Sequence, residues 1–71
     1  MKKFGLLNFQ GSKGSYGFVI IDEEDINQAI DIIDKEKNEN DEYSVSSCVE
    51  RMENFGIKSH EYEEIYVDFG M

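Results

Sequence analysis

The residue types best suited to catalysis are scarce in this chain. It contains one cysteine, Cys48, and one histidine, His60, the two types that form a nucleophile pair when they meet. Cys48 falls on the apolar side of an expected helix, where a buried thiol is inert, and His60 lies in a polar connector. The pair His60-Glu61 lacks the second histidine of a zinc-protease helix, and the acidic run at 22–25 lacks the spacing of a calcium loop. The sequence therefore predicts that the protein is not an enzyme and holds no metal or other cofactor.

Carboxylates are the dominant functional groups. The 71 residues include 16 acids and 7 bases, a formal net charge of -9. The first 21 residues carry three lysines and no acid, whereas residues 22–42 carry ten acids against Lys35 and Lys37. Such a field repels phosphate backbones and attracts basic protein surfaces. The simpler alternative is a solvated surface that only keeps the protein soluble.

The acidic residues are spaced for recognition of a basic surface. On a helix over 23–36, Glu24, Asp31 and Asp34 share one solvent-facing side at intervals of about one and two turns, roughly 5 and 10 Å. A carboxylate row of this kind can imitate the phosphates of one nucleic-acid strand. A polar loop over 38–42 continues the acidic surface. The predicted partner-binding residues are therefore Glu24, Asp31, Asp34, Glu39, Asp41 and Glu42.

A second motif lies near the start of the chain, in the stretch KGSYGFVII at 13–21. It resembles the base-stacking strand of cold-shock domains and RNA-recognition motifs, with Ser15 inserted, through Lys13, Gly14, Tyr16, Gly17, Phe18 and Val19. The resemblance covers about the first 21 residues, and it implies nucleobases stacked on Tyr16 and Phe18. The negative field and the helices expected downstream favour instead a hairpin strand with core aromatics, so direct binding of nucleic acid is not expected.

The elements that position these residues follow from hydrophobic periodicity. Short apolar or alternating runs predict strands, and apolar residues recurring every three to four positions predict helices. Ile26, Ala29, Ile30 and Ile33 are expected to form the buried stripe of the first helix. The predicted elements are strands at 3–9, 16–21 and 64–69, and helices at 23–36 and 45–55. The chain reads as one α+β domain over 1–71, ββααβ, with a three-stranded, mainly antiparallel sheet and two helices on one face.

These features favour a small acidic binding protein. We expect it to block a basic protein surface, in the strongest form as a nucleic-acid mimic of the phage or mobile-element anti-defence type that inhibits a nucleic-acid-handling enzyme. Its partner would then be a nucleic-acid-binding protein. One alternative is an antitoxin or immunity protein against a basic toxin; another is a homo-oligomeric regulatory or structural module that associates through an apolar sheet face or edge. With no secretory signal or long apolar run, a cytoplasmic location is expected and membrane association is not.

Overall fold

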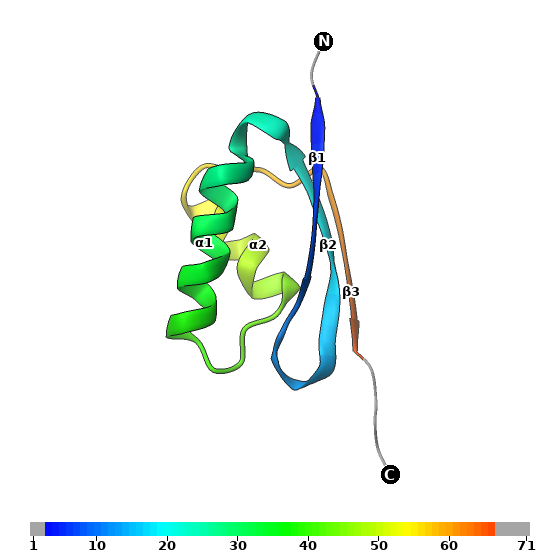
Figure 1. Cartoon of the computed structure of the whole chain (residues 1–71), viewed down its shortest axis with the longest axis vertical. Coiled ribbons are helices and arrows are strands. Elements are labelled where there is room, and N and C mark those ends of the chain that lie inside the picture. Colours follow the sequence, from blue (N-terminus) through cyan, green and yellow to red (C-terminus); the bar gives the residue numbers. More distant parts are fainter. Residues whose placement is uncertain (1–2, 67–71) are drawn as a thin grey trace.

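The computed structural model describes residues 3–66, apart from the side chain of Lys13. Its elements follow the order ββααβ (Figure 1), which confirms the predicted α+β fold. Single 3-10 turns precede the second strand and the first helix. The elements are β1 (Phe4–Gln10), η1 (Ser12–Gly14), β2 (Ser15–Asp22), η2 (Glu23–Asp25), α1 (Ile26–Glu39), α2 (Val45–Asn54) and β3 (Glu61–Tyr66).

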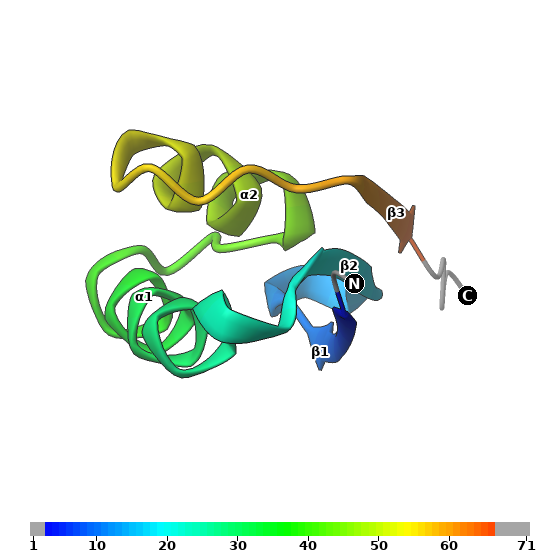
Figure 2. The same ribbon diagram turned by 90° about the horizontal axis from the view of Figure 1, so that it is seen from above.

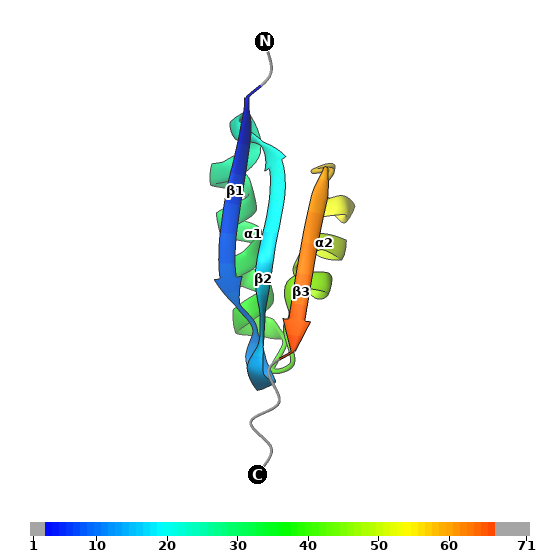
Figure 3. The same cartoon turned by 90° about the vertical axis from the view of Figure 1, so that its right-hand side faces the viewer.

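The three strands form one antiparallel sheet in the order β1-β2-β3. β1 and β2 form a hairpin, and β3 joins the free side of β2 after the chain has passed through both helices. Figure 2 shows two layers, with α1 and α2 together on one side of the sheet. Figure 3 shows the opposite side, where no described element covers the strands. We call that uncovered side the open face.

The core lies between the sheet and the two helices. β2 contributes Val19 and Ile21, and the helices and the turn after α2 contribute the rest of a continuous cluster: Ala29, Ile32, Val45, Cys48, Val49, Met52 and Ile57. Because β2 is the central strand, its inward side chains are covered by both helices at once, and Val19 and Ile21 are fully buried. Burial of these apolar side chains is the main source of stability for a chain this short.

The buried stripe of α1 differs from the prediction. Ile32 is 4% exposed and Ile30 is 44% exposed, although periodicity placed Ile30 in the core and left Ile32 out. Ala29 is fully buried, as predicted, and Ile26 and Ile33 are partly buried. The helix packs against α2 as well as toward the sheet, so its buried side is turned toward α2 relative to the stripe read from sequence. The α-helix also begins at Ile26, after the 3-10 turn over 23–25, and runs to Glu39, so the expected bounds 23–36 are wrong at both ends.

Helix α2 begins and ends with capping interactions. Ser44 is the N-cap: its Oγ accepts from the Ser47 N–H at 3.2 Å, and the Ser44 N–H donates to Ser47 Oγ at 2.8 Å. At the other end Gly56 adopts φ 86°, and the Ile57 N–H donates to the Met52 carbonyl at 2.9 Å. This Schellman motif ends the helix at the position where glycine adopts the left-handed conformation.

The orientation of β3 is a second difference. The alternation of the last strand suggested that Ile65 would lie on its buried side. In the structure Ile65 pairs with Tyr16 on the open face and is 40% exposed, while Glu64 turns toward α2. Glu64 accepts hydrogen bonds from the N–H and Oγ of Ser46, both at 2.6 Å, in the first turn of α2. A carboxylate at a helix N-terminus is electrostatically favourable, which explains a charged residue on this side. Predicted strand positions 67–69 lie outside the described residues.

Candidate binding surfaces

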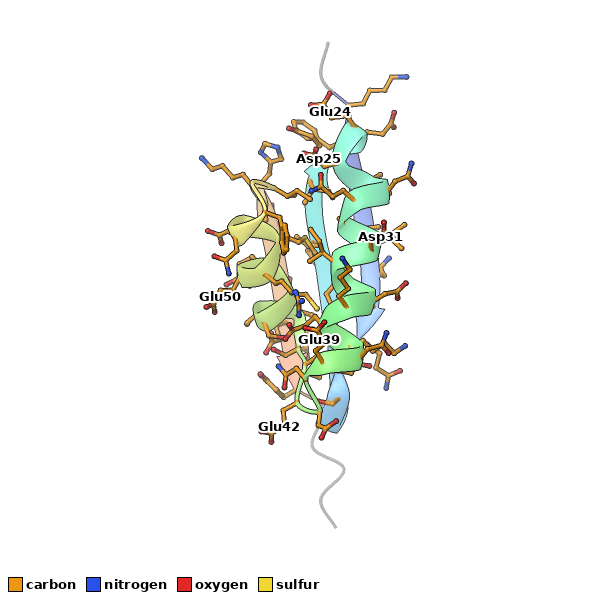
Figure 4. The ribbon with its side chains drawn as sticks, turned by 90° about the vertical axis from the view of Figure 1, so that its left-hand side faces the viewer. Glu24, Asp25, Asp31, Glu39, Glu42 and Glu50 are labelled. Carbon is orange, nitrogen blue, oxygen red and sulfur yellow. The ribbon has the colours of Figure 1, made fainter. Side chains whose placement is uncertain are left out.

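Three of the predicted partner-binding residues lie on α1 and the turn before it. Glu24, Asp31 and Asp34 are all exposed. Within residues 3–66 their side chains have no hydrogen-bond or ion-pair partner. In Figure 4 Glu24 lies at one end of the helical layer and Asp31 lies along α1. These carboxylates are therefore presented to solvent with their charge uncompensated by a neighbouring cation.

The other three predicted residues differ from one another. Glu39 is exposed but already paired, because its Oε1 lies 2.8 Å from Arg51 Nη2. Asp41 and Glu42 are exposed in the turn between the helices, and the Glu42 N–H donates to Asn40 Oδ1 at 2.9 Å. Glu39 thus contributes less net charge to the surface than the sequence suggested, because Arg51 offsets it.

Arg51 links the two helices through two carboxylates of α1. In addition to Glu39, its Nη1 donates to Glu36 Oε1 at 3.1 Å. Burial of Glu36 on its own would raise the pKa of this carboxyl. Hydrogen bonds from Asn40, Arg51 and Ser47 outweigh burial and hold the pKa below its ordinary value. The Glu36 carboxylate is therefore a structural charge that helps fix α1 against α2.

The helical layer carries more acid than the six predicted residues. From η2 through α2, residues 23–54 hold eleven acids against Lys35, Lys37 and Arg51, a formal charge of -8. Glu50 and Glu53 are exposed on α2, and Figure 4 places Glu50 on the side of the layer away from Asp31. The exposed carboxylates therefore lie on both helices instead of forming a single row on α1. Sequence reasoning missed the α2 acids because they were not within the dense run at 22–42.

The acids at the start of the helical layer also lie close together. Carboxylate oxygens of Asp22, Glu24 and Asp25 come within 4.8 Å of one another. Asp22 Oδ1 lies 2.8 Å from Nε2 of His60, whose ring packs edge-on against Phe4 at a centroid distance of 4.7 Å. An exposed acidic cluster does not by itself define a metal site, and we assign it no ligand.

The structure places Cys48 and His60 in different environments. Cys48 is fully buried in the core, and burial, with Glu36 nearby, raises the pKa of its thiol to about 11. His60 instead faces Asp22 at the end of the sheet. The buried thiol matches the expected inert cysteine. Cys48 and His60 therefore do not form a nucleophile pair.

The aromatic side chains of the KGSYGFVII stretch lie on the open face. Tyr16 is 43% exposed and Phe18 is partly exposed, so the expectation that they are core aromatics is wrong. The physical reason is the register of β2: Ser15, Val19 and Ile21 are the fully buried residues, and Tyr16 and Phe18 alternate with them. The resemblance to base-stacking strands implied that these rings are exposed. The net negative charge of the protein nevertheless disfavours binding of a phosphate backbone.

Cross-strand pairing arranges the open face in rows. Residues 16–20 of β2 are each flanked by one residue of β1 and one of β3. The rows are Leu6–Ile20–Glu61, Asn8–Phe18–Glu63 and Gln10–Tyr16–Ile65, with Phe4 beside Asp22 at the end. A groove of about 550 Å³ opens over the last two rows. Around Phe18, the open face is thus aromatic on β2, amide-bearing on β1 and acidic on β3.

No helix within residues 3–66 is long and apolar enough to cross a membrane. Comparison of the chain with protein-family models, with characterised proteins and with solved structures finds no match.

Proposed function

We propose that this chain is a small acidic, non-catalytic binding protein that blocks a basic surface of another protein. The observation that carries the proposal is the uncompensated charge of the helical layer, above all at Glu24, Asp31 and Asp34. Asp31 and Asp34 lie on α1, which is held in place by the core and by the Arg51 bridge to Glu36 and Glu39, and Glu24 lies in the turn that leads into this helix. A fixed acidic surface loses little conformational freedom when a basic partner binds.

The strongest form of the proposal is mimicry of nucleic acid. Asp31 and Asp34 are three residues apart on α1, an axial rise of about 4.5 Å, and Glu24 lies in the 3-10 turn that precedes the helix. The interval between Asp31 and Asp34 is similar to the phosphate spacing along a nucleic-acid strand. The partner would be a nucleic-acid-binding protein, as for an inhibitor of the phage or mobile-element type. An antitoxin or immunity protein would use the same surface against a toxin. In either case the proposal places the protein in the cytoplasm.

The test compares two triple variants with equal change in charge. One is Glu24→Gln, Asp31→Asn and Asp34→Asn; the matched control is Glu50→Gln, Glu53→Gln and Glu61→Gln, on α2 and β3. Partners captured from host lysate at low salt are identified, and affinity for the purified partner is then measured with each form. We expect the α1 variant to bind at least roughly tenfold more weakly than the control variant, and wild-type binding to fall steeply with salt. Equal affinity of the α1 variant and wild type would refute the proposal.

A competition assay separates the two forms of the proposal. Double-stranded DNA or RNA added to the purified complex should displace a nucleic-acid mimic, because both ligands occupy the same basic cleft. A partner that remains bound while it holds nucleic acid favours the antitoxin or immunity alternative.

The open face supports a second candidate, self-association. Leu6, Phe4, Tyr16 and Ile65 are large exposed apolar side chains on this face. Three strands of about seven residues cover roughly 14 by 23 Å, and even twice that footprint is less than the ~800 Å² that each partner buries in a typical stable interface. We therefore expect any dimer through this face to be weak. Sedimentation velocity over micromolar to millimolar concentrations tests it, and Leu6→Gln should abolish concentration dependence if the face is used.

A further inference from the structure

The groove on the open face is lined mainly by uncharged residues, although the protein as a whole is acidic. Its principal lining residues are Asn8, Gln10, Tyr16, Phe18, Glu63 and Ile65. Among the described residues that line it, Glu63 alone is charged. Its carboxylate has no hydrogen-bond or ion-pair partner within the part of the chain that the structure describes. The groove therefore combines aromatic rings, one available carboxylate and two side-chain amides in a volume of about 550 Å³, within the range of ligand-binding sites.

The spacing of the two aromatic residues suits a planar group. Tyr16 and Phe18 are two positions apart on the same side of β2, so their Cα atoms are separated by roughly 6.6 Å along the strand. A planar group in contact with a ring on each side needs about 7 Å, twice the optimal separation between carbon atoms. The strand spacing of Tyr16 and Phe18, both of which line the groove, is therefore compatible with one flat group between their rings.

The polar neighbours of Phe18 define the charge of that group. Phe18 is flanked by Glu63 on β3 and by Asn8 on β1, and Gln10 lies beside Tyr16 in the next row. A group between the rings therefore meets a carboxylate on one side and amide oxygens on the other. Carboxylates and amide oxygens accept hydrogen bonds, so the group that fits is a planar cation with several donors.

We propose that this groove receives an arginine side chain of a partner protein. The guanidinium is planar and stacks on aromatic faces, its fork of N–H donors matches a carboxylate in bidentate geometry, and its remaining donors reach amide oxygens. A lysine ammonium carries the charge but cannot stack as a plane. A nucleobase can stack and donate a hydrogen bond to Glu63, but it carries no positive charge, and its phosphate is repelled by a protein of net charge -9. The site is separate from the helical layer and does not depend on the function proposed for that layer.

Titration with small arginine probes, followed by NMR at low salt, tests the proposal. We expect N-acetyl-L-arginine methylamide to shift the signals of Tyr16, Phe18 and Glu63, with a dissociation constant on the order of millimolar. The lysine analogue should bind several-fold more weakly. The citrulline analogue, which keeps the planar shape and loses the charge, should bind roughly tenfold more weakly.

Two variants on the same strand supply the matched comparison. Glu63→Gln should weaken arginine binding roughly tenfold, whereas Glu61→Gln, on the same face but outside the groove, should change it less than twofold. Phe18→Leu should weaken binding severalfold in a protein whose spectrum shows that it remains folded. The triple α1 variant should bind the probe as wild type does, so a failed acidic-layer proposal and a failed arginine site are distinguishable.

Four outcomes would overturn the arginine site. Binding of the citrulline analogue within twofold of the arginine probe would show that the groove does not recognise the positive charge of the guanidinium. Unchanged binding by Glu63→Gln would remove the carboxylate from the site. Shifts confined to α1 would indicate general attraction to the acidic layer, and tighter binding of adenosine with shifts at the same residues would assign the groove to a nucleobase.

Discussion

The orientation of α1 can be tested with two isoleucines that are two residues apart. Ile32 is 4% exposed and belongs to the core, whereas Ile30 is 44% exposed. The perturbation is Ile32→Ala, and the matched control is Ile30→Ala on the same helix. Both substitutions have the same effect on intrinsic helix propensity, so the difference in the free energy of unfolding reports the packing of each side chain alone.

The expected difference follows from burial. Isoleucine has three more carbon groups than alanine, and each is worth about 0.8 kcal/mol when buried, so Ile32→Ala loses about 2.4 kcal/mol of transfer free energy. The cavity left in a closed core adds to that, which brings the expected cost to about 3–4 kcal/mol. Ile30 keeps about half of its surface in water, so its truncation should cost about 1 kcal/mol without a cavity. The variants should differ by about 2–3 kcal/mol.

Urea unfolding followed by circular dichroism measures this difference. A domain of 71 residues has a total stability of roughly 4–11 kcal/mol and an m-value near 1 kcal/mol/M, so the two midpoints should lie roughly 2 M or more apart. If Ile30→Ala destabilises the protein as much as Ile32→Ala, the rotation of α1 described above is wrong. The set of carboxylates that faces solvent would then change with it.

Three further predictions concern single residues. Cys48 should react with a thiol reagent at pH 8 only as fast as the protein unfolds, because its thiol is fully buried with a pKa raised to about 11; rapid reaction of the native protein would contradict this. Gly56→Ala should cost about 1 kcal/mol in urea unfolding because φ is 86°, although no atom blocks the added methyl, and Gly56→Asn should cost less. Glu64 has a pKa lowered in the folded state: burial raises it, but bonds from Ser46 and Tyr66 prevail. The ionised Glu64 carboxylate therefore stabilises the fold above the unfolded pKa near 4.3, and this stabilisation is lost as pH falls through the folded pKa. Glu64→Gln should accordingly be less stable than wild type at pH 7 and nearly equal to it at pH 3.

The order and type of the elements were predictable because each has a local cause. Alternating or continuous apolar residues marked the strands, and the glycine after Phe55 marked the end of α2 through its φ angle. The orientation of α1 was not predictable in this way. Periodicity identifies an apolar stripe but cannot tell which edge of it turns toward a second helix, and the stripe of α1 is wide enough to include both Ile30 and Ile32.

The candidate surfaces were predictable to different degrees. The exposure of Glu24, Asp31 and Asp34 was predictable because these residues lie away from the apolar stripe. They are exposed in the structure although the buried side of α1 differs from the predicted one. The pairing of Glu39 with Arg51 joins residues 12 positions apart on different helices, so no local pattern reveals it. The open-face groove also depends on long-range register: Glu63 meets Phe18 only because β3 pairs with β2 across 45 positions of sequence.

The position of β2 at the centre of the sheet has a consequence for amide hydrogen exchange. The Lys3 carbonyl accepts from the Glu23 N–H and the Ile20 carbonyl accepts from the His60 N–H, which fixes the direction of every backbone group in the ladders. The amides of residues 16–21 on β2 point to a neighbouring strand, whereas those of Leu6 and Asn8 on β1, and of Tyr62 and Glu64 on β3, point outward. Protection should therefore be continuous over residues 16–21 and should alternate between adjacent residues on both edge strands, so that among the strands β2 is the one that reports the global opening of the domain.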